Sequence, residues 1–347
     1  MPERNTMKKI QELQQVKGDA YDYYIAGNED TDLFEKIFLV DDIVEEICKP
    51  DKYFLIGEKG SGKTAYSVYM SKSDKINSFC SISLVENTLY QRFLNMKRQK
   101  ALELSSFKDV WINLIYLILA EKIRKEYGET FFSSIKYKQL SKAIDVFYSD
   151  AFKPEFVNAF EFVDNASASI NSMMKQGLFS TGTKASAETS QKYVEQSFQI
   201  SLLKIRDGFE KAFMSVNLKK PTILFVDGID ARPRDIDNEQ YFECLVGLVN
   251  AVLEMNQSFL KEKQIKIMLL IRPDIMYKMP VHNMNQKLRN NSVLLNWVTS
   301  YRKYIDSKLF KIADDYFMKQ QDYSYELGEC WNYYFPYKVE YQEKWKA

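Results

Sequence analysis

The chain has almost no histidine and little cysteine. Its 347 residues include one histidine, His282, and four cysteines, which are Cys48, Cys80, Cys244 and Cys330. No two cysteines form a C-x-x-C pair, which argues against a cysteine–histidine zinc site and against a disulfide framework. A serine or cysteine hydrolase would need His282 as its base, and we interpret that residue as an ordinary surface or helix-end histidine.

A long apolar run and an excess of one charge are also missing. The longest apolar run, Trp111 to Ala120, is interrupted by Asn113 and is shorter than the roughly 20 residues that span a bilayer. Residues 1–5 do not begin an apolar signal segment. The net charge of +1 disfavours a strongly basic nucleic-acid binder. We therefore expect no membrane partner and a reducing, cytoplasmic setting.

Apolar residues, by contrast, are abundant. The chain is 46% hydrophobic and 14% aromatic, which is enough for a packed core, and its length fits one elaborated domain or two. We divide it into a polar arm (1–31), a discontinuous core (32–97 and 218–320), a mainly helical insertion (98–217) and an aromatic C-terminal tail (321–347). Within the insertion, the Ser- and Thr-rich segment Asn165 to Gln191 is interpreted as a mobile loop.

The spacing of apolar residues predicts alternating strands and helices. The sequence predicts strands at 53–56, 76–84, 222–226, 265–271 and 292–295, and the continuous apolar run at 222–226 is typical of a strand buried on both faces. Helical spacing predicts helices at 33–47, 64–70, 107–119, 194–213, 241–255 and 301–317. For the first of these helices, Asp32 and Glu35 form a capping-box-like start. The fold class predicted is α/β, with a parallel sheet flanked by helices.

One glycine-rich segment follows the first predicted strand and precedes a helix. It fits the pattern G-x-x-x-x-G-K-[ST] and reads Gly57-Glu58-Lys59-Gly60-Ser61-Gly62-Lys63-Thr64. Its glycines let successive backbone N–H groups turn toward phosphate oxygens, and the helix that follows adds the positive end of its dipole. Lys63 can reach the β and γ phosphates, and the Thr64 hydroxyl can bind Mg²⁺. The segment therefore predicts an ATP and Mg²⁺ site.

Acidic residues follow the third predicted strand. Asp227 ends the run Thr222 to Val226 and would bind Mg²⁺, mostly through water. Asp230 is the candidate to orient or deprotonate an attacking water, because hydrolysis needs a carboxylate near the γ-phosphate. The alternative for Asp230 is a turn or helix cap after the strand.

Arginines follow the later strands. Arg272, at the end of the strand 265–271, can sense or stabilise the γ-phosphate, or it can be a structural arginine paired with a nearby carboxylate. Arg289 can act in trans on a neighbouring copy's nucleotide, or it can be an ordinary solvated arginine. Arg232 and Arg234 are further candidates for phosphate or partner contacts.

These motifs resemble a known family. The loop Gly57 to Thr64 and the strand ending in Asp227-Gly-Ile-Asp230 look like the Walker motifs of P-loop ATPases of the additional-strand class. They are most similar to the STAND and KAP-like branches of the AAA+ relatives. Segments Gly27 to Asp32 and Val293 to Trp297 are similar to a bacterial group of such ATPases that is often found in phage-defence loci. The resemblance implies ATP rather than GTP, since guanine-recognition motifs are absent.

The chain departs from that family in two ways. Ala231 stands where those families commonly have a glutamate, so we expect slow or partner-dependent hydrolysis. No winged-helix or repeat sensor domain follows the core, so a separate sensor or effector protein, together with homo-oligomerisation, is expected. The leading hypothesis is an ATPase that acts as a nucleotide-gated assembly switch, with antiviral defence implied by the resemblance alone.

Two other functions remain open on sequence grounds. A nucleic-acid-dependent motor or loader would use the basic clusters Lys97 to Lys100 and Lys219-Lys220, which are otherwise solvated helix or strand ends. An ATP-holding scaffold with little turnover would dock a partner through the aromatic tail after residue 320. The alternative for that tail is that it folds back onto its own core.

Overall fold

The structure is a computed structural model, and it describes most of the predicted core. The described residues are 12–15, 18–25, 29–85, 107–132, 137–150, 202–230, 238–279, 288, 290–297, 304–322 and 324–336. The strands are β1 (Phe54–Gly57), β2 (Phe79–Leu84), β3 (Thr222–Asp227), β4 (Ile265–Ile271) and β5 (Ser292–Leu295).

Helices precede, connect and follow these strands. The first half of the chain contributes α1 (Ala20–Ile25), α2 (Glu29–Ile37), α3 (Asp42–Cys48), α4 (Lys63–Lys72), α6 (Phe107–Phe132) and α7 (Lys138–Asp150). The second half contributes a helix over 202–215, then α11 (Asn238–Gln257), α12 (Pro273–Lys278), the 3-10 turn η1 (Tyr304–Asp306), α14 (Lys308–Met318) and α15 (Glu329–Tyr334). Within the described ranges, no helix is both long and apolar enough to cross a bilayer.

The five strands form one parallel sheet in the order β2-β3-β4-β1-β5. Strand β4 therefore lies between β1 and β3, and β2 and β5 are the edges. Every residue of β3 and β4 is buried, which explains why their sequences are mostly apolar. The predicted α/β class with a parallel, helix-flanked sheet is confirmed at this level.

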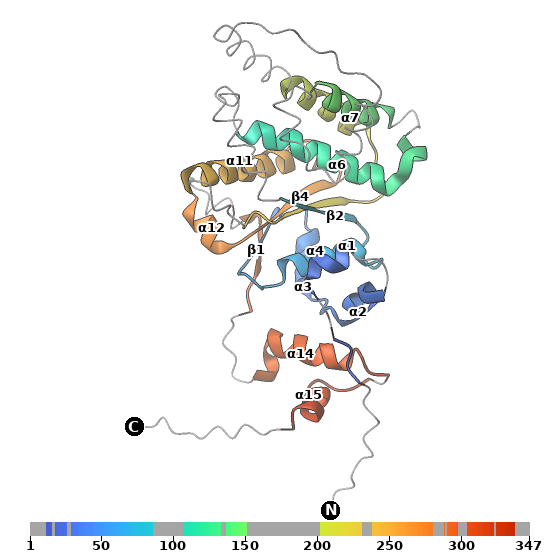
Figure 1. Cartoon of the computed structure of the whole chain (residues 1–347), viewed down its shortest axis with the longest axis vertical. Helices are drawn as coiled ribbons and strands as arrows, with labels where there is room; N and C mark the ends of the chain where they lie inside the picture. The colour runs from blue at the N-terminus through green and yellow to red at the C-terminus, as the bar shows by residue number, and fades with distance from the viewer. Residues whose placement is uncertain are drawn as a thin grey trace, which may run out of the picture.

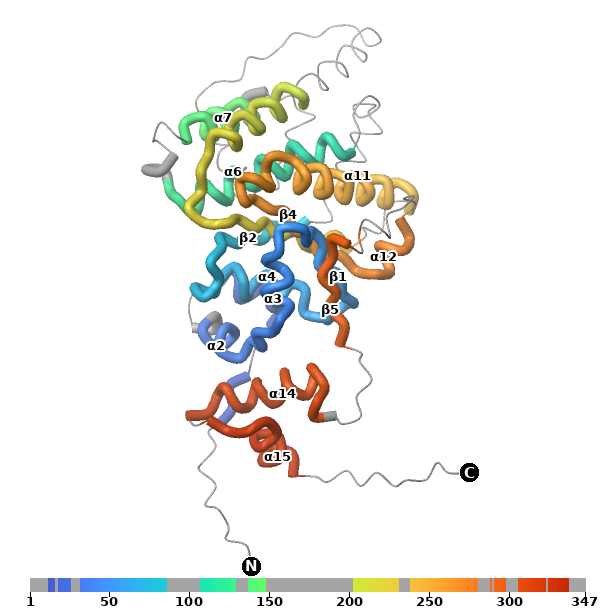
Figure 2. The backbone as a smooth tube through the Cα atoms, turned by 180° about the vertical axis from the view of Figure 1, so that it is seen from behind, coloured from blue at the N-terminus to red at the C-terminus, as the bar shows by residue number. Residues whose placement is uncertain are grey.

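Helices cover both faces of the sheet (Figure 1). One face packs against α1, α3 and α4 in a single apolar cluster. The other face packs against α11 and α6, and α7 and the helix 202–215 belong to the same second cluster. Figure 2 shows α6 and α11 side by side over the sheet. Helix α6, which falls in the predicted insertion, thus shares a core with α11, and the division of the chain into domains remains a prediction.

The single helix predicted over residues 33–47 is wrong. Helix α2 ends at Ile37, and α3 begins at Asp42 after an extended Asp41 at φ −123°. The Asp41 carboxylate accepts a hydrogen bond from the Ile43 N–H at 3.2 Å, so it caps a new helix instead of continuing the old one. Asp32, predicted as a helix start, lies inside α2.

Other predicted boundaries shift by a few residues. The predicted strand 76–84 begins only at Phe79, after a turn over 74–78. The helix predicted over 301–317 begins at Lys308, because the Ser307 hydroxyl accepts the Phe310 N–H at 3.0 Å and acts as its N-cap. The predicted loop 165–191 lies outside the described residues.

Helices α14 and α15 form a small unit beyond α2 and α3 (Figure 1). Trp331 of α15 packs between Phe310 and Phe317 of α14, with ring centroids 5.3 and 6.0 Å away. The unit contacts the rest of the chain through polar groups, including the Lys319 amine on the Phe38 carbonyl at 2.8 Å. Residues 324–336 of the aromatic tail therefore pack on α14 of their own chain, and both interpretations of the tail stay predictions.

Candidate nucleotide site

The predicted site residues meet at the carboxyl ends of three neighbouring strands. Strands β1, β3 and β4 are parallel neighbours, so the segments that follow them emerge side by side. The loop 58–62 joins β1 to α4, residues 228–230 follow β3, and Arg272 follows β4. The topology thus brings together three segments that are far apart in sequence.

Glycine conformation shapes the loop after β1. Gly60 and Gly62 have φ values of +79° and +89°, which side chains other than glycine rarely adopt. A Cβ added at either glycine would meet no atom within 4 Å, so the backbone conformation and not crowding requires glycine there. At Gly57 the reason for glycine is close packing. A Cβ there would lie 2.2 Å from the Ser61 hydroxyl oxygen and 3.0 Å from the Leu295 Cβ.

The loop holds a buried amine against its own carbonyls. The side chain of Lys63 is only 8% exposed, and its Nζ donates to the Gly57 carbonyl at 2.9 Å and to the Glu58 carbonyl at 3.2 Å. Gly62, the N-cap of α4, has no side chain to accept the first N–H groups of that helix. A positive charge and a helix N-terminus therefore lie at the same place, which favours an anion. The side chains of Glu58 and Lys59 are exposed.

The two predicted metal ligands are in direct contact. The Thr64 hydroxyl donates to Asp227 Oδ2 at 2.7 Å, and the Gly228 N–H donates to Asp227 Oδ1 at 2.7 Å. These bonds hold the carboxylate at the end of β3 against the start of α4. No group of three or more His, Cys, Asp or Glu side chains in the described part of the chain could hold a metal. A hydroxyl and one carboxylate nevertheless suit Mg²⁺, which usually keeps several waters and binds substrate phosphates.

Asp230 carries a buried acid group beside these residues. Its Oδ2 lies 3.8 Å from Lys63 Nζ, and its Oδ1 is buried without a hydrogen-bond partner among the described residues. The pKa of the Asp230 carboxyl is raised from 3.8 to about 6, mainly by burial; Lys63 and Arg272 oppose this shift, and the charges of Asp227 and Asp274 add to it. A carboxyl with this pKa changes charge near neutral pH, as a general base must.

Arg272 follows β4 at the candidate site, as predicted, but its guanidinium is paired with Asp274. Its guanidinium donates to both carboxylate oxygens of Asp274, at 2.9 and 2.8 Å. This is the local ion pair that was the alternative for Arg272, and the γ-phosphate role stays a prediction. Arg289, Arg232 and Arg234 lie outside the described residues.

Sequence reasoning missed one contact of the loop. Trp297 follows β5, and its indole N–H donates to the Ser61 carbonyl at 2.8 Å. The Ser61 hydroxyl itself is buried without a partner among the described residues. The contact depends on β5 pairing with β1, and no local pattern in the sequence reveals that pairing.

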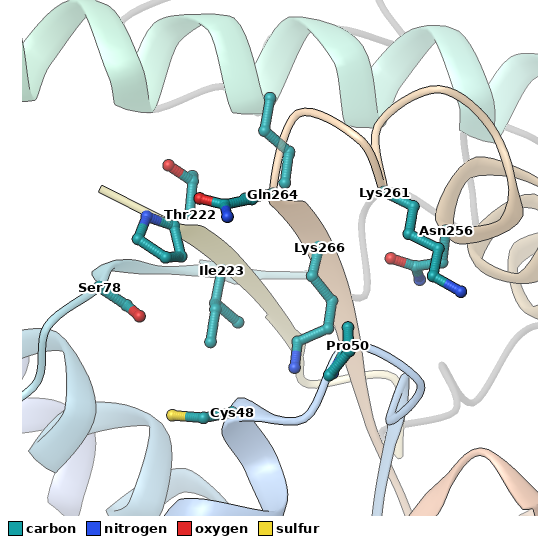
Figure 3. A pocket seen from close by; sticks show the side chains of 11 residues that line it. Cys48, Pro50, Ser78, Thr222, Ile223, Asn256, Lys261, Gln264 and Lys266 are labelled. Carbon is teal, nitrogen blue, oxygen red and sulfur yellow. The ribbon is translucent and has the colours of Figure 1, made fainter. Parts of the chain in front are cut away.

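A cavity lies at the opposite ends of the strands, where β3 and β4 begin. It measures about 260 Å³, and Lys266 points from β4 toward the end of α3 (Figure 3). The Lys266 amine donates to the carbonyls of Ile47 and Lys49, and burial lowers its pKa to about 8. This lysine closes the C-terminus of α3 and does not belong to the candidate nucleotide site.

Comparisons of the chain with protein-family models, with curated proteins and with solved structures found no match. The chemistry of the site itself is therefore the basis for assigning a function.

Proposed function

We propose that this chain binds Mg–ATP at the carboxyl ends of β1, β3 and β4, and hydrolyses it slowly. The observation that carries the proposal is the Thr64–Asp227 hydrogen bond, with Lys63 in the preceding position. It joins the start of a helix, the end of a buried strand and a buried amine at one point. A hydroxyl, a carboxylate and an ammonium in that arrangement suit a phosphate chain with its divalent cation.

Several features of the chain fit a triphosphate. Gly60 and Gly62 adopt the positive φ that a phosphate-binding turn needs, and no side chain caps the N-terminus of α4. The buried oxygens of Ser61 and Asp230 lack partners among the described residues, which is costly unless a ligand or water bonds to them. Thr64 and Asp227 would hold Mg²⁺, which when bound would offset charge on the β and γ phosphates.

Asp230 would hold and accept a proton from the attacking water. Its unpartnered Oδ1 is free to accept that hydrogen bond, and its raised pKa makes it a stronger base than an exposed aspartate. Ala231 offers no second carboxylate, so slow or partner-dependent turnover is part of the proposal.

The biological role is argued from resemblance. Strand β4 lies between β1, which precedes the glycine-rich loop, and β3, which ends in Asp227. An all-parallel sheet flanked by helices is compatible with the P-loop resemblance, and the STAND and KAP-like assignment is part of the proposal. We propose a nucleotide-gated assembly switch in the cytoplasm, acting as a homo-oligomer with a separate effector, in antiviral defence.

Nucleotide binding by a Lys63→Ala variant tests the proposal. Because a charge-assisted hydrogen bond contributes about 1.5–3 kcal/mol, we expect Mg–ATP affinity to fall about 10- to 100-fold in isothermal titration calorimetry. Lys311→Ala, which removes an exposed lysine of α14, is the matched control and should bind as the parent does. Equal ATP affinity in all three proteins would overturn the assignment. Tight binding with no measurable turnover in the parent would favour the scaffold function instead.

A further inference from the structure

A lysine-rich groove follows the outer edge of β2, away from the candidate nucleotide site. It measures about 800 Å³ and lies between α1 and α4 on one side and α6 on the other. Figures 1 and 2 both show β2 at the margin of the sheet, between these two helical layers. We call it the lysine groove, after the lysines that line it, Lys72, Lys122, Lys125, Lys219 and Lys220.

The fold concentrates positive charge in this groove. Its five lysines come from α4, from α6 and from the segment before β3, and two acids, Asp74 and Glu126, line it with them. The whole chain carries a net charge of only +1. Among the described residues, Lys72, Lys125, Lys219 and Lys220 make no ion pair, whereas Lys122 has a further contact. This unbalanced charge is complementary to a polyanion.

A buried hydroxyl provides a second, independent observation. Ser81 of β2 lines the groove and is 3% exposed, and its Oγ has no hydrogen-bond partner among the described residues. A buried hydroxyl left without a partner costs free energy, and an acceptor oxygen on a ligand would recover it. Phosphate and sugar oxygens are such acceptors.

Tyr24 favours a nucleic acid over an added acidic peptide strand as the polyanion. Its hydroxyl accepts the outward N–H of Ile82 at 3.3 Å, so it occupies the edge that an added peptide strand would need. The amines of Lys72 and Lys122 lie 5.5 and 6.0 Å from the centre of its ring. Tyr21 and Tyr127 also line the groove. Lysines combined with aromatic rings are typical of sites that hold a nucleic-acid backbone and stack its bases.

We propose that the lysine groove binds single-stranded nucleic acid, with phosphates on the lysines and bases against the tyrosines. An extended strand fits a recess between two helical layers, and the +1 net charge does not oppose it because the attraction is local. The inference does not depend on ATP binding, since no residue of the loop 57–64 lines the groove.

Fluorescence anisotropy with labelled oligo(dT) and oligo(rU) of about 12 nucleotides tests the proposal in EDTA, without ATP. Five neutralised phosphates at ~0.7 each give a log–log salt slope of about −3.5, or about 100-fold weaker binding between about 50 and about 200 mM salt. Lys122→Gln with Lys219→Gln should weaken binding about 10-fold and reduce that slope by about 1.4.

The matched control removes two exposed lysines elsewhere, with Lys261→Gln and Lys311→Gln. It has the same net charge as the groove variant and should bind within about twofold of the parent. Equal losses in both double variants, or no binding at about 50 mM salt, would overturn the proposal. So would a polyglutamate peptide that displaces the oligonucleotide at equal charge, because it would identify an acidic protein as the partner. Retained binding in Lys63→Ala would separate this site from the nucleotide site.

Discussion

At the scale of single residues, Asp230 shows a conflict between stability and chemistry. Its carboxyl is buried near Asp227, and burial is the main reason why its pKa rises to about 6. The folded state binds this proton more tightly than the unfolded state does. The contribution of the protonated Asp230 to the stability of the fold is therefore complete below pH 3.8. It is lost as the pH rises through about 6. At neutral pH, the charged Asp230 therefore costs stability, as is common for residues kept for function.

The Asp230→Asn variant separates these two effects. We expect it to lose most ATP turnover, because an amide cannot accept the proton, and to unfold at a higher temperature than the parent at about pH 8. The gain is on the order of 1 kcal/mol, allowing for solvent screening of a side chain that is 26% exposed. This gain in stability should shrink toward zero near about pH 4.5. Calorimetric melts of both proteins in EDTA, at about pH 8 and about pH 4.5, measure the gain.

An exposed aspartate provides the control for that experiment. Asp207 is 60% exposed and pairs with Lys211 along its own helix, so Asp207→Asn should leave turnover unchanged. Unchanged turnover in Asp230→Asn would remove its proposed role as the base. A stability difference that is the same at both pH values would contradict the raised pKa.

At the scale of secondary-structure elements, α6 and α11 approach closely at one glycine. A Cβ added at Gly247 would lie 2.6 Å from the Phe107 Cβ and 3.0 Å from the Lys108 backbone nitrogen. The Trp111 indole also donates to the Cys244 carbonyl across this interface, at 3.0 Å. The glycine therefore sets the distance between the two helices that cover one face of the sheet.

Alanine substitutions at two helical glycines should have opposite effects. Gly247→Ala forces α6 and α11 apart and should destabilise the fold by about 1–3 kcal/mol, despite the better helix propensity of alanine. Gly208→Ala is the matched control, because a Cβ there meets no atom within 4 Å, and it should stabilise by about 0.5–1 kcal/mol. Urea unfolding gives both values. A Gly247→Ala variant as stable as Gly208→Ala would show that the interface is not tight.

The elements that the sequence predicted are those whose signal is local. The loop Gly57 to Thr64 needs only its own glycines and its flanking strand and helix, and the strands that end at Asp227 and just before Arg272 are mostly apolar. The break at Asp41 was missed because apolar spacing continues across it, while a capping carboxylate ends one helix and starts another. The Trp297–Ser61 contact was missed because it depends on strand order, which packing determines.

At the scale of the whole molecule, charge and packing are distributed unevenly. The near-zero net charge conceals the lysine groove at one edge of the sheet, and only the fold brings those lysines together. The unit formed by α14 and α15 is joined to α2 and α3 by polar contacts such as Lys308 with Asp41 at 3.2 Å. Such contacts are weak compared with the apolar packing that joins helices to the sheet. Local opening is therefore expected first in the α14–α15 unit.

One buried carboxylate holds α15 in that unit. Asp314 of α14 is fully buried and accepts the Gly328 N–H at 2.5 Å and the Trp331 N–H at 3.0 Å. Asp314→Ala leaves both N–H groups without an acceptor, which should cost about 2–4 kcal/mol and release α15 from Phe310 and Phe317. Hydrogen exchange should then be at least about 10-fold faster in α15, with protection in β3 and β4 unchanged.

Asp315→Ala is the matched control, because that carboxylate pairs with Lys319 of its own helix at 2.9 Å and does not reach α15. Its effect on exchange in α15 should be small. If β3 and β4 lose protection together with α15 in Asp314→Ala, the unit is not independent and unfolds with the sheet. If only α15 opens, its aromatic face can separate from α14 while the sheet and the candidate nucleotide site remain folded, which is what a docking role for the tail would require.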